Sequence, residues 1–222
     1  MENCEWVARK SGSRIEALIG GRLWKLRTAG NLEELWEKIG GEDYSRIPYW
    51  TELWPSSIAL GEWLCIAQEE IRGKTCLDLG CGLGLTALIG QSLGANVAGI
   101  DYEPAALACC RANAALNHCP EPAWLLMDWA SPGLKMGRAD ILWAADVAYE
   151  EAFWEPLLNL MAQAVAGGRA WLAEPGRTIF YSFLRKARAG GWSARPVHRR
   201  IIPEWNGQKN GVRTAIWEFT RG

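Results

Sequence analysis

Histidine is scarce in this chain of 222 residues, and paired cysteines are absent. Only His118 and His198 occur, and none of the seven cysteines forms a Cys-x-x-Cys pair. Two histidines are too few for a multi-histidine metal site, and the cysteine spacing is typical of neither a zinc ribbon nor a disulfide framework. The Gly-x-Ser-x-Gly element of many serine hydrolases is also missing. We therefore expect no metal cofactor and no hydrolase chemistry.

Long apolar runs and an excess of one charge are lacking too. No stretch approaches the roughly 18 apolar residues that span a bilayer, and the first residues form neither a basic nor an apolar leader. The chain has 24 Lys and Arg against 25 Asp and Glu, a formal net charge of −1, so it has no overall attraction to nucleic acid or anionic lipid. We expect a cytoplasmic protein without a membrane or nucleic-acid partner.

What is abundant is tryptophan, with 14 residues in an otherwise ordinary globular composition. The length favours one domain with a small appendage. We expect residues 1–50 to form an N-terminal lobe, with a strand near residues 22–26, and residues 51–222 to form the main domain. The connector Ile47–Ser57 is rich in aromatic residues and proline. Its rings, Trp54 among them, are candidates for a pocket wall or for core packing.

From residue 74 onward, short apolar runs alternate with helical patterns. Strands are predicted at 75–79, 96–101, 123–127, 140–145 and 169–174, and helices at 85–93, 104–117, around 153–165, and at 179–189. This alternation is typical of βαβ units and of a parallel sheet covered by helices. Two final strands, 192–202 and 212–220, are joined by a turn around Asn206-Gly207 and add an antiparallel strand.

A glycine-rich loop follows the first strand of this series, at the edge where open α/β sheets bind ligands. Gly80, Gly82 and Gly84 lack the spacing of a dinucleotide fingerprint, which disfavours a nicotinamide oxidoreductase. Asp78 precedes them, and a carboxylate there would repel a pyrophosphate but pair with an ammonium group. The loop therefore favours a nucleoside with a cationic amino-acid tail, such as S-adenosylmethionine. Cys81 could contact this ligand or simply fill space.

Two more acids follow the ends of predicted strands. Asp101 lies about 20 residues after the first glycine, where an acid meets ribose hydroxyls in such folds. Asp128 could accept a hydrogen bond from an adenine amino group while Trp129 covers the ring. If only the glycines are considered, a tight turn explains them. The acids at three strand ends favour a ligand site.

These motifs carry a resemblance to a known family. The segment Leu77–Gly84, together with Asp101, resembles the motif of class I S-adenosylmethionine-dependent methyltransferases. Tyr49–Ser57 and Asp146-Val-Ala-Tyr149 are similar to methyltransferase family 16, which contains protein lysine methyltransferases and predicted nicotinamide N-methylases. Glu174-Pro-Gly-Arg177 is similar to the Asp-Pro-Gly-Arg of the branch that methylates a lysine of the electron transfer flavoprotein β subunit, with Glu in place of Asp.

The resemblance implies an α/β fold with a Rossmann-like seven-stranded sheet. The implied strand order is 3-2-1-4-5-7-6, with one antiparallel strand, flanking helices and a small N-terminal lobe. S-adenosyl-L-methionine is the implied cofactor. The residues expected to bind it are Trp54, Asp78, Gly80, Cys81, Gly82, Gly84, Asp101, Tyr102, Asp128, Trp129 and Ala145.

Asp146 and Tyr149 are the predicted catalytic residues, because they follow the fourth strand at the ligand-binding edge. A carboxylate beside an aromatic hydroxyl could orient an amine that has lost its proton. The alternative is that Asp146 caps the next helix. Arg177 could contact an acidic group of the substrate or face solvent.

The expected acceptor is a lysine side chain of a protein. A small amine, or an N-heterocycle such as nicotinamide, is the alternative acceptor. The third possibility is a noncatalytic protein that binds S-adenosylmethionine.

Overall fold

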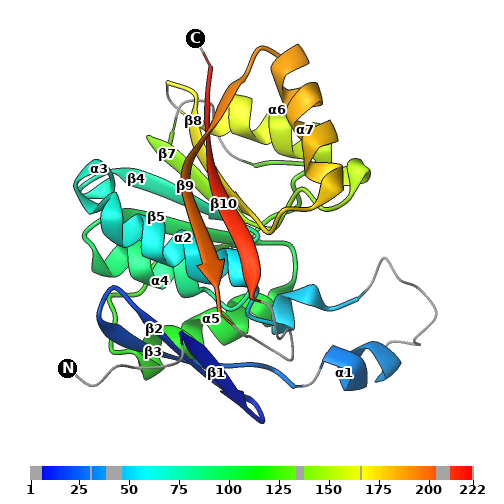
Figure 1. The fold of residues 1–222 in the computed structure, drawn as a ribbon. Coiled ribbons are helices and arrows are strands. Elements are labelled where there is room, and N and C mark those ends of the chain that lie inside the picture. Colours follow the sequence, from blue (N-terminus) through cyan, green and yellow to red (C-terminus); the bar gives the residue numbers. More distant parts are fainter. Residues whose placement is uncertain are drawn as a thin grey trace.

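The computed structural model describes residues 7–30, 32–38, 47–133, 138–165, 167–203 and 211–221, and it contains two β-sheets (Figure 1). A small antiparallel sheet is formed by β1 (Ala8–Ser11), β2 (Arg14–Ile19) and β3 (Arg22–Arg27). Only β3 was predicted from the sequence. The turn at Asn206-Gly207 lies outside the described residues.

The larger sheet has seven strands in the order β6-β5-β4-β7-β8-β10-β9. Its strands are β4 (Thr75–Leu79), β5 (Asn96–Asp101), β6 (Ala123–Leu126), β7 (Ile141–Ala145), β8 (Arg169–Glu174), β9 (Ser193–Ile202) and β10 (Val212–Thr220). The pairs from β6 to β8 are parallel, and β10 is antiparallel to both of its neighbours. The expected Rossmann-like fold and its order 3-2-1-4-5-7-6 are therefore confirmed.

Helices cover both faces of this sheet, because alternate residues of its central strands are apolar on both sides. Trp143 and Trp171 belong to the core under α2 (Pro55–Ile66) and α4 (Leu85–Ser92). Leu142 and Leu172 belong to the core under α6 (Trp154–Ala164) and α7 (Thr178–Ala189). Figure 1 shows these two helix pairs on opposite sides of the sheet. The remaining helical elements are α1 (Leu32–Lys38), η2 (Tyr49–Thr51), α3 (Gln68–Ile71), α5 (Pro104–Leu116) and η3 (Glu151–Phe153). In the part of the chain described, no helix is long and apolar enough to cross a bilayer.

The N-terminal sheet is attached to α5 by side-chain amides. The amide oxygens of Asn113 and Asn117 accept hydrogen bonds from the backbone N–H groups of Arg27 (2.8 Å) and Lys25 (2.9 Å) on β3. The Asn113 amide nitrogen also donates to the carbonyl of Leu83, in the glycine loop, at 3.0 Å. The small sheet is thus connected through α5 to the ligand-binding edge of the large one.

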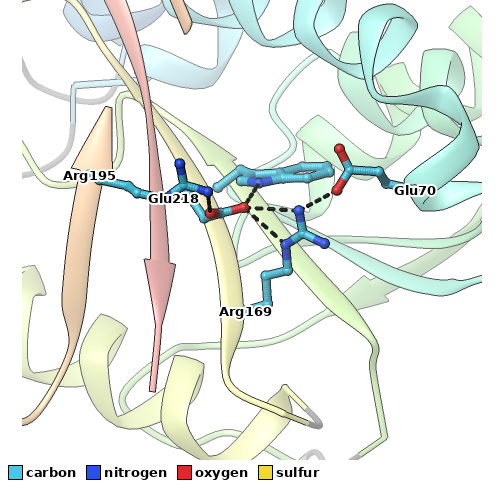
Figure 2. A network of polar contacts seen from close by, with 5 residues as sticks. Glu70, Arg169, Arg195 and Glu218 are labelled. Atoms are coloured by element: carbon cyan, nitrogen blue, oxygen red, sulfur yellow. Dashed lines mark hydrogen bonds and ion pairs between the residues drawn. The ribbon is translucent and has the colours of Figure 1, made fainter. Parts of the chain in front are cut away.

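A buried carboxylate joins three strands at the far end of the sheet, where β8 begins (Figure 2). Glu218 on β10 accepts hydrogen bonds from Arg169, Arg195 and the Trp171 indole, and Arg169 also pairs with Glu70. Burial alone would raise the pKa of Glu218, but these donors outweigh it and hold the pKa below its usual value. Both oxygens of Glu218 accept hydrogen bonds from residues of the fold, so we regard the cluster as structural.

Candidate active site

A cleft of about 250 Å³ lies at the carboxyl edge of β4, β5 and β7, beside the connector before α2. Open α/β sheets bind their ligands at this edge. The residues predicted from the sequence that line the cleft are Trp54, Gly80, Cys81, Gly82, Asp101, Tyr102, Trp129, Ala145, Asp146 and Tyr149. Asp78, Gly84 and Asp128 do not line it. Glu52, Ser57 and Thr86 line it without having been assigned there from the sequence, and Trp50 and Arg177, for which the sequence left a pocket role and a structural or solvent-exposed role open, line it too.

The backbone of the glycine loop has a conformation that is strained for residues other than glycine. Gly80, Gly82 and Gly84 all have left-handed φ values, of 67°, 51° and 83°. A Cβ at Gly80 would lie 3.1 Å from Val147 and 3.3 Å from the Trp129 ring, and one at Gly84 would lie 2.9 Å from the Cys110 sulfur. The loop therefore requires glycine for its shape and for the close approach of its neighbours. Gly84 contributes indirectly, as the N-cap of α4.

Asp101 fixes this loop while facing the cleft. Its Oδ2 accepts a hydrogen bond from Gly82 N at 2.9 Å and its Oδ1 accepts one from Glu103 N at 3.0 Å. Burial raises the pKa of Asp101, and the backbone donors oppose that effect. Each carboxylate oxygen can accept a further hydrogen bond. Asp101 can thus still receive two donors, as the adjacent hydroxyls of a ribose would provide.

The other two acids have different surroundings from those expected. Asp78 is 1% exposed, and its Oδ2 accepts a 2.6 Å hydrogen bond from the Thr86 hydroxyl, so it braces β4 against α4. Burial raises its pKa to about 7. Asp128 is exposed and accepts a hydrogen bond from Ala130 N, which closes its own turn. Neither carboxylate lines the cleft, and their expected contacts with a ligand stay predictions.

Asp146 is held by Arg177 at the centre of the site. The arginine Nε donates to Oδ1 at 2.8 Å and its terminal nitrogen donates to Oδ2 at 2.7 Å, a bidentate pair. Asp146 has a φ of 54°, which is rare for a residue other than glycine and marks a constrained position. The next helical elements begin with Glu150 and Phe153 as N-caps, so Asp146 does not cap them. The helix-cap alternative for Asp146 is therefore wrong.

The element Glu174-Pro-Gly-Arg177 explains how Arg177 is placed. Glu174 is 7% exposed, and its Oε2 accepts hydrogen bonds from the backbone N–H groups of Gly176 (2.8 Å) and Arg177 (3.0 Å). These bonds close a turn between β8 and α7 and direct the arginine towards the end of β7. Sequence reasoning missed this pair, and the only available signal was that both segments follow neighbouring strands.

Five aromatic rings form a continuous row, which we call the aromatic arc, and all of them except Phe153 line the cleft. Successive ring centroids are 5.4 to 5.9 Å apart in the order Trp54, Tyr49, Tyr149, Phe153 and Trp129. The Trp54 indole also donates to the carbonyl of Tyr49 at 3.0 Å. Burial raises the pKa of Tyr149, so its hydroxyl keeps its proton at neutral pH. The arc thus adds an aromatic surface with two hydroxyls, those of Tyr49 and Tyr149, to the cleft that Asp146 also lines.

No cluster of three or more potential metal ligands occurs in the described ranges. The site itself offers the Asp146–Arg177 pair, the Tyr149 hydroxyl and the glycine loop.

Known proteins are similar to this chain in sequence and in fold. The family model for ribosomal protein L11 methyltransferase (PrmA) matches residues 62–164. The electron transfer flavoprotein beta subunit lysine methyltransferase of Mus musculus is 30% identical over 195 residues, covering 83% of this chain and 71% of the relative. Its Rattus norvegicus counterpart is 29% identical over 190 residues, with the same coverage.

Among solved structures, magnesium protoporphyrin IX methyltransferase (ChlM) from Synechocystis PCC 6803 with bound SAM superimposes with a TM-score of 0.59 at 19% identity. The match covers 87% of this chain and 99% of that one. It shows that the fold is shared.

Proposed function

The chain belongs to the family of the electron transfer flavoprotein β-subunit lysine methyltransferases, and we propose that it transfers a methyl group from S-adenosylmethionine to a protein lysine. The observation that carries this proposal is the cleft itself. The glycine loop and Asp101 line it at the ends of β4 and β5, and Asp146, Tyr149 and Arg177 line it after β7 and β8. A nucleoside-binding half is thus joined to a half that can orient an amine.

The residues of the first half fit S-adenosylmethionine. Asp101 would hold the ribose hydroxyls, and the left-handed glycines give the loop the shape that places the backbone of Gly80 and Gly82 in the cleft lining. The Trp129 indole N–H is buried without a hydrogen-bond partner, and it lies in the lining where the ligand would bring acceptors. Trp129 and the exposed ring of Tyr102 would flank the adenine.

S-adenosylmethionine, when bound, supplies a methyl group on a positively charged sulfur. An amine attacks the methyl group in line with the carbon–sulfur bond and displaces the sulfur. The chain must therefore hold the amine lone pair in place and keep water away. Asp146 holds the amine in place, because Arg177 fixes both carboxylate oxygens and each oxygen retains one lone pair that can accept a hydrogen bond from an amine N–H. The Tyr149 hydroxyl can hold the same nitrogen. The aromatic arc excludes water and favours the approach of a cationic side chain.

A protein acceptor fits the mouth of the cleft. Tyr102 is 61% exposed and the Arg177 side chain is 40% exposed, so the cleft reaches the molecular surface at both. A lysine side chain is long and flexible enough to enter from a folded partner. The name of each curated relative above refers to a lysine of a protein, which supports the same acceptor.

The proposal is tested with purified enzyme and methyl-labelled S-adenosylmethionine. One reaction contains purified electron transfer flavoprotein β subunit, and another contains cell lysate that is afterwards separated into macromolecular and low-mass fractions. We expect label on a lysine of the protein fraction, located by mass spectrometry. The matched control is Asp146→Asn, because asparagine tolerates the left-handed backbone and should fold.

Label confined to the low-mass fraction, with nicotinamide or another amine methylated, would reject the protein-lysine acceptor. That result would instead support the small-molecule alternative.

A further inference from the structure

Glu52 is an acid in the cleft that the mechanism above does not use. It lies between η2 and α2, and its side chain is only 13% exposed. Its Oε1 accepts a 2.6 Å hydrogen bond from the ammonium group of Lys10 on β1, 42 residues away in the sequence. The N-terminal sheet therefore supplies a positive charge directly behind a residue of the cleft wall.

The second oxygen of Glu52 is buried and has no hydrogen-bond partner. It is the one carboxylate oxygen with these properties among the described residues. A buried acceptor left unsatisfied costs about 1–3 kcal/mol, and more when it is charged. The cost is recovered if a ligand brings a donor to this oxygen, and the oxygen belongs to a residue that lines the cleft.

The charges around the cleft indicate what kind of donor fits. The acids that line it are Glu52, Asp101 and Asp146, and Arg177 is the one basic residue in the described lining. Arg177 is already bonded to both oxygens of Asp146. With Arg177 paired to Asp146 and Lys10 paired to Glu52, one of the three negative charges is left over, so the cleft attracts an added cation and repels an added anion.

The position of Glu52 relative to the glycine loop is also defined. The preceding helical turn, η2, lies over the loop, because a Cβ at Gly82 would be 3.5 Å from the carbonyl oxygen of Trp50. Trp50 and Glu52 flank Thr51, which is fully buried. The carboxylate is therefore carried by a fixed turn that contacts the loop.

We propose that Glu52, anchored by Lys10, binds an organic ammonium group in the cleft. This inference rests on the proposed function, in which two such groups enter the cleft. One is the α-ammonium of the amino-acid part of S-adenosylmethionine, and the other is the ε-ammonium of the incoming lysine. In both cases the ammonium donates to the free oxygen of Glu52, and the N-terminal sheet acquires a role in ligand binding through Lys10.

The first experiment compares ligands with and without the amino-acid part. Wild type and Glu52→Gln are titrated calorimetrically with S-adenosylhomocysteine and with 5′-methylthioadenosine, which lacks the α-ammonium. If Glu52 binds the donor, the variant loses about tenfold or more in affinity for the first ligand and stays within about twofold for the second.

The second experiment addresses the acceptor. The enzyme is saturated with S-adenosylhomocysteine and titrated with n-butylammonium, a mimic of the lysine side chain, or with the uncharged 1-pentanol. Tryptophan fluorescence reports binding, because Trp50 and Trp54 line the cleft. If Glu52 binds the acceptor, Glu52→Gln weakens n-butylammonium binding about tenfold or more and leaves 1-pentanol unaffected.

Glu62→Gln is the matched control, because Glu62 is ion-paired with Arg200 at 20% side-chain exposure and does not line the cleft. It should change neither titration. Should Glu52→Gln fail to fold, Glu52→Asp keeps the charge but withdraws it by one methylene, and the same selective loss is expected at smaller size.

Equal affinities of Glu52→Gln and wild type in both titrations would overturn the inference. Equal weakening of S-adenosylhomocysteine and 5′-methylthioadenosine would also overturn it, because the loop rather than an ammonium site would then be affected. These titrations involve no methyl transfer. A failure to label protein lysine would therefore reject the proposed acceptor without deciding the role of Glu52.

Discussion

Arg177→Met is the most direct test of how the site is oriented. The substitution removes two hydrogen bonds of 2.8 and 2.7 Å to Asp146, whose side chain is 6% exposed, while keeping the length of the stem. Removing one partner of a fully buried ion pair costs about 3–5 kcal/mol. Because the Arg177 side chain is 40% exposed, water can replace part of what is lost, and we discount the cost to about 2 kcal/mol.

That loss has two measurable consequences. For a chain of this length, about 2 kcal/mol lowers the melting temperature by about 4–8 °C. Turnover should fall by about 10- to 100-fold, because Asp146 no longer holds the amine in one direction, which is an effect on the transition state. The affinity for S-adenosylhomocysteine should stay within about twofold.

Two further variants separate orientation from charge. Arg177→Lys keeps the charge but cannot form the bidentate pair, so its turnover should lie between those of wild type and Arg177→Met. Arg185→Met is the control, because Arg185 is an exposed arginine within α7, the helix that Arg177 precedes, and it donates a hydrogen bond to the Ser182 hydroxyl. Its stability should change by no more than about 0.5 kcal/mol.

Thermal unfolding by circular dichroism, initial rates and calorimetry provide the readouts for these variants. An Arg177→Met enzyme with wild-type turnover and an unchanged melting temperature would refute the positioning role of Arg177.

Four more outcomes are expected. Asp101→Ala should weaken S-adenosylhomocysteine binding by about 1–3 kcal/mol in calorimetry, because a charged acceptor is lost; unchanged affinity would remove Asp101 from the binding site. Tyr149→Phe should lower turnover more than cofactor affinity, as initial rates and the same titration would show. Incubation with a chelator should leave turnover unchanged, whereas a loss restored by zinc or magnesium would contradict metal independence. Asp78 has a folded pKa of about 7 against an ordinary 3.8, so the folded state binds more protons between these values and stability falls as pH rises through them. In urea unfolding, the free energy of unfolding of Asp78→Asn should rise relative to that of wild type between pH 4 and pH 8.

Much of the fold was predictable because its strands are short apolar runs between turn residues. Strands β4, β5 and β8 have the predicted bounds. By contrast β1 and β2 were missed, because β1 has one apolar residue in four and β2 ends in three consecutive apolar residues, so neither shows a clear alternation of apolar and polar residues. Their apolar face becomes evident only when Ile15 and Ile19 pack into the core with α2.

The position of the site was predictable from the sequence, but the contacts of its side chains were not. Sequence placed acids at the ends of β4, β5 and β7, and the strand order brings these ends together. The direction of each side chain depends on the elements packed around it. Asp78 meets Thr86 under the loop, whereas Asp101 meets Gly82 within it. Contacts across 31 and 42 residues, to Asp146 and Glu52, have no local sequence signal at all.

The two ion pairs of the cleft differ in a way that predicts different roles. Arg177 occupies both oxygens of Asp146, so this carboxylate is fixed in direction and only weakly negative to an approaching cation. Lys10 bonds to one oxygen of Glu52 and leaves the other without a partner. Fixed direction serves the reacting nitrogen, whereas a free buried oxygen serves binding. Changes at Arg177 should therefore appear mainly in turnover, and changes at Glu52 mainly in the dissociation constant of an ammonium-bearing ligand. If the two variants showed the same kinetic pattern, this division of roles between the carboxylates would be wrong.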